Sequence, residues 1–525
     1  MAGYDIIIRG GTIIDGTGDA RRNADVGIRN GDIEAVGDLN GQEAWRIIDA
    51  AEKYIAPGFI DITNHSDTHL SLFTYPGQES ALLQGVTTII GGNCGASLAP
   101  LASSEAIKGI AKWADPSDIN INWTTFEEFL RQLGSIGLGV NFGSFTGYGT
   151  LRRGVMTDQI RPATVQERQE IAFLLESAVD QGSFGLSLGL SYGHERVSTT
   201  EEIIDIARAL KPSDSLVKLH LRSEGKDLLA AVNEAVRIGR EAGVRVQISH
   251  FKAIGKKAWP REHQAREIIR RAKESGLDID FDVSPYATTG SPLYTLIPAW
   301  ARAGGFAELF RRIDDFGERQ KIIEELLSYT LHYEKILVTS AFIKTIVGKS
   351  LAEVARQASL PPEEALLQTI RANRGRVSIV GRTVSRKNMI RSIQDIHAMI
   401  ASDGAGYAKE VELKGDLAHP RSFGAFPHFW HRFVGESALL TPEEAIRKST
   451  SRPARKLGIE KRGEIKKGYW ADLIVFDPRL FRDRATYKNP FRYAEGLNAV
   501  IVNGVLAAEN GAVTEARAGK VLRKA

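Results

Sequence analysis

The chain has 525 residues, of which 43% are hydrophobic and 25% are charged, and its formal net charge is +4. This composition is typical of a globular protein, and so small a charge over this length predicts no binding to nucleic acid or to a membrane surface. No apolar stretch is long enough to span a bilayer. Cys94 is the single cysteine, so an intrachain disulfide is excluded. Because the N-terminus also shows no secretory signal, we expect a cytoplasmic protein.

The two ends of the chain both show short β-strand patterns. Alternating apolar runs flank Asn30-Gly31 near the N-terminus, and similar runs flank Asn503-Gly504 near the C-terminus. Asn-Gly between such runs is a strong hairpin signal. Neither end has enough strands to close a sheet by itself. We therefore expect residues 1–57 and 461–525 to form one small β-sandwich domain together.

The middle of the chain, 58–460, alternates strand and helix patterns. Capping-box sequences at Thr164–Glu167 and Thr199–Glu202 mark the starts of helices between the strands. Eight strands that alternate with helices favour an α/β fold of the (β/α)8 type, a TIM-like barrel, and an open doubly wound sheet is the alternative. The expected strands are 54–63, 86–93, 138–147, 182–190, 216–222, 245–252, 278–286 and 399–406.

About 110 residues separate the last two of these strands, which is far more than an ordinary loop. Helical patterns occupy 305–332 and 350–374 within this segment. We expect a lid-like insertion at about 290–395 over the mouth of the barrel.

His220 and His250 end two consecutive predicted strands. The segment between them has apolar residues at helical spacing, and Gly243 stands at the position of a helix C-cap. This pattern predicts a strand–helix–strand unit, whose parallel strands end on the same face of the sheet. We therefore expect the two imidazoles to lie side by side. That arrangement favours a metal site over the alternative of two separate structural histidines.

Three more polar residues lie at predicted strand ends: His65 just after the first strand, Cys94 just after the second, and Asp403 in the segment that closes the eighth. A thiolate and imidazoles are ligands that zinc prefers, and three protein ligands with a water in the fourth position make a catalytic site. For Asp403 by itself the alternative is a turn or helix-cap role, because aspartate is common before glycine in turns.

An ordered set of short motifs runs through the chain. They are Pro57-Gly-Phe-Ile-Asp61, Gly92-Asn-Cys-Gly95, Gly147-Tyr-Gly-Thr-Leu-Arg152, His220-x-Arg222-x-Glu224, Ile248-Ser-His250-x-Lys252, Ser402-Asp-Gly404, His419-Pro-Arg421 and, in the tail, Ala471–Pro478 with Val502-Asn-Gly504. This set resembles the N-acyl-D-amino-acid deacylases (D-aminoacylases) of the amidohydrolase superfamily, essentially from end to end. The resemblance implies a zinc ion held tightly by Cys94, His220 and His250, with Asp403 as the general base.

The chain departs from this family at one place. Members usually carry His-x-His after the first strand, whereas here Thr63 replaces the first histidine and His65 remains. The resemblance therefore implies one functional zinc and a weakened second metal position. His65 is either a ligand at that second position or a hydrogen-bond donor to an oxyanion. The loss at Thr63 also leaves open a non-catalytic binding protein on the same barrel, although the other site residues are intact.

The resemblance implies a small-molecule substrate, an N-acyl-D-amino acid, whose hydrolysis releases a carboxylate and a free D-amino acid. The carboxylate of the amino acid needs a cationic partner, and Lys252 and Arg421 are the candidates. The resemblance places Tyr192 and Tyr286 near them as further substrate contacts. Surface charges and tyrosines at the edge of the core are the alternatives for these four residues.

The alternative activity is hydrolysis of a different amide, such as a cyclic ureide (a hydantoin), a dipeptide or a xenobiotic amide. Two cations favour a linear substrate with a carboxylate, because a neutral ring does not need them. The sequence does not predict the oligomeric state.

Overall fold

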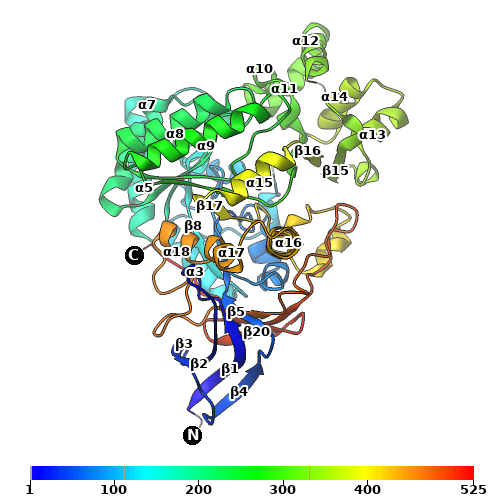
Figure 1. Ribbon diagram of the computed structural model, residues 1–525. Helices are drawn as coiled ribbons and strands as arrows, with labels where there is room; N and C mark the ends of the chain where they lie inside the picture. Colours follow the sequence, from blue (N-terminus) through cyan, green and yellow to red (C-terminus); the bar gives the residue numbers. More distant parts are fainter. Residues whose placement is uncertain (1–2, 112, 330, 525) are drawn as a thin grey trace.

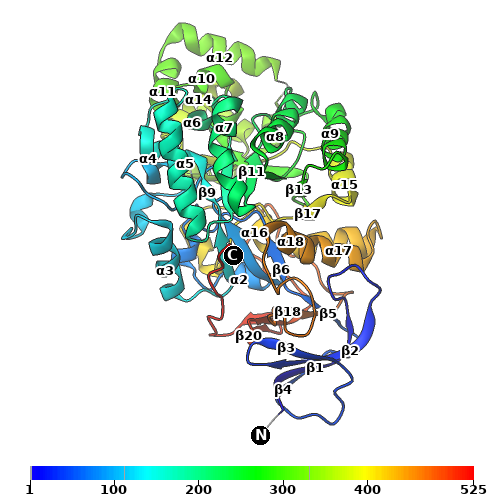
Figure 2. The ribbon, with the colours of Figure 1, turned by 90° about the vertical axis from the view of Figure 1, so that its left-hand side faces the viewer.

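The computed structural model describes residues 3–111, 113–329 and 331–524. A central barrel is flanked by helices. A β-sheet region that carries the N-terminus lies at one end of the molecule, and a lobe of helices with a small sheet projects at the other end (Figure 1, Figure 2). Among the described helices, none combines the length and the apolar character that a membrane span requires.

Parallel strands form the barrel, as the sequence predicts. These strands are β6 (Phe59–Asp61), β7 (Val86–Gly91), β8 (Asn141–Ser144), β9 (Thr146–Gly147), β10 (Gly185–Gly189), β11 (Leu216–His220), β12 (Arg245–Ile248), β13 (Ile279–Val283) and β17 (Ala398–Ile400). Each pairs with the next, except that β8 and β9 follow one another along the chain, separated only by Phe145, and together occupy the third of the eight strand positions of the barrel. A parallel bridge between Asn64 and Gly404 closes the ring beyond β6 and β17. The (β/α)8 fold class is confirmed.

Amphipathic helices cover the outside of the barrel. In α8 the apolar residues Leu228, Val232 and Ala235 are buried on one face, and Gly243, with φ of 68°, caps the C-terminal end. Thr164 and Glu167 form the expected capping box at the start of α5. The helices of this layer and its loops are α1 (Ser71–Thr74), α2 (Glu79–Leu82), α3 (Phe126–Ile136), α4 (Tyr148–Met156), α5 (Val165–Asp180), α6 (Gly193–Arg196), α7 (Thr200–Ala207), α8 (Leu228–Ala242), α9 (Glu262–Glu274), α15 (Arg386–Gln394), α16 (Arg421–Phe429), α17 (Pro442–Ser449) and α18 (Ser451–Leu457).

Strands from both ends of the chain form one sheet of nine strands. They are β1 (Tyr4–Ile13), β2 (Arg22–Arg29), β3 (Asp32–Gly37), β4 (Ala44–Asp49), β5 (Tyr54–Pro57), β18 (Leu473–Phe476), β19 (Leu497–Val502), β20 (Val505–Glu509) and β21 (Ala512–Val513). β5 lies between β1 and β18, and a bridge from Asp32 to Trp470 folds the sheet back on itself around a core of mainly isoleucine and valine side chains. The two ends of the chain therefore share one core.

The expected strand 54–63 is two strands in the structure. β5 belongs to the terminal sheet and β6 to the barrel, and Gly58 lies between them. A Cβ atom at Gly58 would lie 2.2 Å from the side chain of Thr87. Glycine at this position therefore allows the chain to pass closely against β7 where it turns from the sheet into the barrel.

The last residues of the chain leave the terminal sheet, although we expected 461–525 to lie wholly within it. The N–H of Gly519 donates to the carbonyl of Leu138 (2.8 Å), and the N–H of Leu522 donates to the carbonyl of Phe142 (2.7 Å). The C-terminal segment thus runs along β8, the third strand position of the barrel.

Residues 288–382 form the projecting lobe. Its strands β14 (Thr288–Pro292) and β15 (Ile336–Ala341) flank β16 (Val377–Arg382) in an antiparallel sheet. The buried side chains of the lobe form a cluster of their own. The sequence predicted its helices but not this sheet, because β14 has no alternation of apolar and polar residues. The helices of the lobe are α10 (Ala299–Arg302), α11 (Gly305–Asp314), α12 (Phe316–Ser328), α13 (Leu351–Ala358) and α14 (Pro362–Ala372).

Candidate active site

A cavity of about 1500 Å³ opens at the C-terminal ends of the barrel strands. His65, Cys94, His220, His250 and Asp403 line it from the barrel, and residues of β14 and β16 line it from the lobe. The C-terminal ends of the strands are where (β/α)8 barrels carry their active sites. The cavity therefore holds all five of the predicted metal and base residues.

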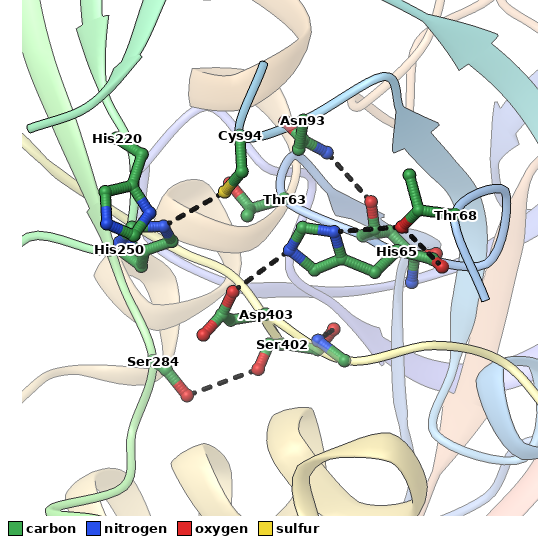
Figure 3. A network of polar contacts seen from close by, with 12 residues as sticks. Thr63, His65, Thr68, Asn93, Cys94, His220, His250, Ser284, Ser402 and Asp403 are labelled. Atoms are coloured by element: carbon green, nitrogen blue, oxygen red, sulfur yellow. Dashed lines mark hydrogen bonds and ion pairs between the residues drawn. The ribbon is translucent and has the colours of Figure 1, made fainter. Parts of the chain in front are cut away.

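Cys94, His220 and His250 converge on one point. Their ligand atoms all lie within 4.8 Å of one another, and Sγ of Cys94 is 3.3 Å from Nε2 of His250. The two imidazole rings have centroids 4.6 Å apart, because β11 and β12 are parallel neighbours. Figure 3 shows the sulfur atom and both rings facing the same space. A soft sulfur and two nitrogen donors in a buried pocket fit a zinc ion.

The backbone is strained at three residues of this site. Cys94, His250 and Asp403 have φ angles of 54°, 36° and 56°, in the left-handed region that residues other than glycine seldom adopt. Strain of this kind costs about 1–3 kcal/mol per residue and is concentrated at functional sites. The surrounding barrel holds these three side chains in position at a cost in stability.

The carboxylate of Glu224 orients His250. Nδ1 of His250 lies 3.1 Å from Oε1 of Glu224, to which it can donate a hydrogen bond, and Nζ of Lys252, which lies 2.8 Å from Nδ1, donates to the same oxygen (2.6 Å). This bond leaves Nε2 of His250 free to act as a ligand, which is the arrangement that metal-binding histidines usually have. Burial alone would raise the pKa of Glu224, but the charges of Lys252, His220 and His250 hold it well below its usual value. The sequence assigned no role to Glu224, although its place four residues after His220 was a signal.

The surroundings of Cys94 favour the ionised thiolate form of its side chain. Burial raises the pKa of its thiol, but the charge of His250 and hydrogen bonds with His220, His250 and His65 outweigh burial, so the net pKa lies well below the usual value. The thiolate is the form of cysteine that binds metals. The charge state of Cys94 thus agrees with the geometry of the three donors.

Asp403 lies beside the three donors and is held between two positively charged groups. One carboxylate oxygen is 3.3 Å from Nε2 of His65, and the other accepts a hydrogen bond from the guanidinium of Arg421 (Figure 3 shows the contact with His65). Burial raises the pKa of Asp403, but Arg421, His250 and His65 together hold it well below its usual value. The carboxylate is therefore ionised, and Arg421 is paired with it in the structure.

Thr63 lies at the position where the family resemblance implied a histidine. Its hydroxyl donates to Oδ1 of Asp282 (2.9 Å) and accepts from Nζ of Lys218 (2.7 Å). Lys218 also donates to the carbonyl of Ile62, and its side chain is completely buried. Beneath Cys94, His220 and His250, the chain thus carries a buried ammonium group in a network with a hydroxyl and a carboxylate. We did not predict a role for Lys218 or Asp282 from the sequence, although a charged residue within an apolar strand was a signal.

The two tyrosines that we predicted as substrate contacts line different pockets. The ring of Tyr192 lies 5.1 Å from the ring of His220 and lines the main cavity. Tyr286 is buried between His419 and His428, with ring centroids 5.1 and 4.5 Å away. It lines a smaller pocket, which it shares with His250, Lys252, Asp403 and Arg421.

Comparison with known proteins agrees with this site. The D-aminoacylase of Alcaligenes xylosoxydans xylosoxydans is 30% identical over 526 residues, which cover 99% of this chain and 98% of the relative. The chain belongs to the D-aminoacylase family. The N-acyl-D-glutamate deacylase of the same organism is 31% identical over 525 residues, which cover 99% of this chain and 96% of that relative.

Two further matches support membership of the D-aminoacylase family. A model of the amidohydrolase family matches residues 412–508. A crystal structure of N-acyl-D-glutamate deacylase from Bordetella bronchiseptica, complexed with zinc and a phosphonate inhibitor, superposes with a TM-score of 0.83 and 29% identity over 99% of both chains. As a D-aminoacylase family member, the protein is a metal-dependent amidohydrolase.

Proposed function

We propose that the protein hydrolyses the amide bond of an N-acyl-D-amino acid, releasing a carboxylate and a free D-amino acid. The observation that supports this proposal most directly is the cluster of Cys94, His220 and His250 next to the ionised Asp403, within one large cavity. Relatives that match the whole chain are named for this reaction.

Zinc is the metal that this donor set fits best, held by Cys94, His220 and His250. When bound, zinc polarises the amide carbonyl and makes a water molecule acidic enough to ionise near neutral pH. We assign a single tightly bound ion, because Thr63 offers no imidazole and its hydroxyl is already engaged with Lys218 and Asp282.

Asp403 acts as the general base. As an ionised carboxylate it takes a proton from the attacking water and passes it to the nitrogen of the leaving amine. His65, 3.3 Å from Asp403, holds the carboxylate in place and stands next to the position of the developing oxyanion. Both residues follow barrel strands that close the ring, so their spacing is set by the barrel itself.

Lys252 and Arg421 recognise the carboxylate of the amino acid. In the structure, Lys252 is paired with Glu224 and Arg421 with Asp403. A substrate carboxylate that engages Arg421 weakens the strongest counter-charge on Asp403, so substrate binding makes Asp403 more basic. Tyr192 and Tyr286 line the two adjoining pockets and supply further substrate contacts.

We also propose the lobe of 288–382 as a lid within the insertion expected at about 290–395, and the barrel at 58–460 as the catalytic domain. The lobe is tied to the barrel region by ion pairs of Arg376 with Asp115 (3.0 Å) and of Lys344 with Asp416 (2.6 Å). Both pairs are partly exposed to solvent and so are worth little individually. These two pairs alone therefore do little to hold the lobe at the rim of the cavity, where the N–H of Leu417 also donates to the carbonyl of Thr339 (2.6 Å).

The test is a panel of N-acetyl-D- and N-acetyl-L-amino acids assayed for release of acetate. Wild type should release acetate from the D-series, and Asp403→Asn should lower kcat at least about 100-fold while keeping the same metal content. Equal rates on both series would contradict the assignment to D-amino acids. Undiminished turnover in Asp403→Asn would contradict the assignment of Asp403 as the general base.

A further inference from the structure

His220 and His250 are oriented through different ring nitrogens. In His250, Nδ1 faces Oε1 of Glu224 (3.1 Å) and Nε2 faces Sγ of Cys94 (3.3 Å). In His220, Nε2 faces Oγ of Ser191 (2.8 Å). Oε2 of Glu224 is 3.9 Å from Nε2 of His220, which is beyond hydrogen-bond distance. The hydroxyl of Ser191 is therefore the close partner of the His220 ring.

The register of the barrel strands brings Ser191 to this ring. β10 and β11 are parallel neighbours, and Gly189 of β10 pairs with His220 of β11. The N–H of Leu190 donates to the carbonyl of His220 (3.3 Å), so the chain stays beside β11 as it leaves β10. Ser191 and His220 both line the cavity. Strand pairing thus sets the contact at the mouth of the barrel.

Nδ1 of His220 is left as the nitrogen that can bind a metal. It is buried, and within 3–111, 113–329 and 331–524 it has no nitrogen or oxygen atom as a hydrogen-bond partner. A buried polar atom without such a partner is unfavourable. The ligand atoms of Cys94, His220 and His250 lie within 4.8 Å of one another, so an ion held among them supplies the partner that Nδ1 lacks.

The contact with Ser191 also fixes which way the ring of His220 faces. A turn of 180° about the Cβ–Cγ bond would exchange Nε2 with Cε1 and Nδ1 with Cδ2. A C–H group would then face the hydroxyl, and a carbon atom would replace the free nitrogen. When Nε2–H donates to Oγ of Ser191, Nδ1 of the neutral ring carries no hydrogen and offers its lone pair. One hydroxyl thus selects both the orientation and the tautomer of the ring.

We propose that Ser191 is a positioning residue for the metal: it holds His220 so that Nδ1 is the ligand atom. Ser191 supplies no ligand atom itself and acts through His220, as Glu224 acts through His250. Partners of this kind orient metal-binding histidines and make them more basic. This inference rests on the proposed function, because it concerns how the chain holds the metal assigned there.

The affinity of the full-length protein for zinc, measured by competition with a chromophoric chelator, tests this role. Ser191→Ala should weaken zinc binding about tenfold, at the low end of the range for such partners, because the hydroxyl is uncharged. Ser191→Thr keeps a hydroxyl and should recover most of the lost affinity. Ser378→Ala is the matched control, since Ser378 of β16 is also partly buried and lines the same cavity. It should bind zinc as wild type does.

Nuclear magnetic resonance of the wild type reads the ring nitrogens directly and does not depend on a variant that folds. Cadmium-113 replaces zinc in protein labelled with nitrogen-15 histidine, and one-bond coupling shows which nitrogen of each ring is the ligand. We expect one ring coupled through Nδ1 and another coupled through Nε2. In Ser191→Ala, the Nε2 resonance of the ring coupled through Nδ1 should shift, while the ring coupled through Nε2 should keep its resonances.

Zinc affinity that Ser191→Ala leaves unchanged, an equal loss in Ser191→Ala and Ser191→Thr, or cadmium coupling through Nε2 alone overturns the inference, while the metal centre and the proposed function stand. Absence of metal binding by the wild type contradicts the metal centre and this inference together. Absence of turnover on the panel of N-acetyl-amino acids, with the zinc and cadmium results as expected, supports the role of Ser191 and contradicts the deacylase function alone.

Discussion

Oε1 of Glu224 lies 3.1 Å from Nδ1 of His250 and 2.6 Å from Nζ of Lys252. One buried carboxylate thus holds the ring of a histidine that we assign to the metal and restrains the cation that we assign to the substrate carboxylate. Partners of this kind usually change metal affinity 10- to 100-fold when they are replaced. The contact links the binding of the metal to the binding of the substrate.

Glu224→Gln should therefore weaken zinc binding by about tenfold, and Glu224→Ala by about 100-fold. Competition with a chromophoric chelator measures the dissociation constant directly. Glu241→Gln is the matched control, because Glu241 is exposed and pairs with Arg237 on the surface of α8. An unchanged zinc affinity in both Glu224 variants would show that the contact does not support the metal site.

Lys218 should stabilise the fold. Its buried ammonium group donates to Thr63 (2.7 Å) and to the carbonyl of Ile62, and Asp282 shares the hydroxyl of Thr63 (2.9 Å). Removing one partner from a buried charged network costs about 3–5 kcal/mol. Lys218→Met should lower the free energy of unfolding by about this amount in urea titrations, whereas Lys211→Met, at an exposed position, should change it little. Equal stability of the two variants would contradict this role.

Asp61 should make stability depend on pH. Burial raises the pKa of Asp61 to about 6, although hydrogen bonds from Asn64 and Ser402 oppose that rise. Its pKa in the unfolded chain is about 4, so the folded state binds more protons between these values. The free energy of unfolding should therefore fall as pH rises from about 4 through about 6, by about 3 kcal/mol.

Urea titrations of metal-free wild type and Asp61→Asn between about pH 4.5 and 7.5 check this dependence, since the absence of metal removes the competing effect of pH on zinc binding. The stability of wild type relative to Asp61→Asn should decline across this range. Asp19→Asn, which changes an exposed carboxylate, should track wild type. A constant difference between wild type and Asp61→Asn would contradict the raised pKa.

The parts of the site that the sequence predicted are those that depend on strand periodicity. His220 and His250 end consecutive strands of one crossover, and parallel pairing of β11 and β12 brings their rings to 4.6 Å. Cys94 and Asp403 follow other strands of the same barrel, so the fold alone gathers all four on one face. A residue that ends a strand can therefore be placed from the sequence pattern alone.

The parts that the sequence did not predict depend on contacts between side chains. The bond from Glu224 to His250, the pairing of Arg421 with Asp403 and the network around Lys218 join residues that are far apart or lie in irregular segments. Whether two charged side chains meet depends on rotamers and loop paths, which periodicity does not encode.

X-ray absorption at the zinc edge of the metal-loaded protein tests the central claim most directly. We expect about one zinc per chain, with one sulfur at about 2.3 Å and nitrogen ligands at about 2.0–2.1 Å. Cys94→Ser should abolish the sulfur shell, and His220→Ala and His250→Ala should each remove a nitrogen ligand or the metal itself. A zinc spectrum without sulfur, or one that Cys94→Ser leaves unchanged, would contradict a metal centre built on Cys94, His220 and His250.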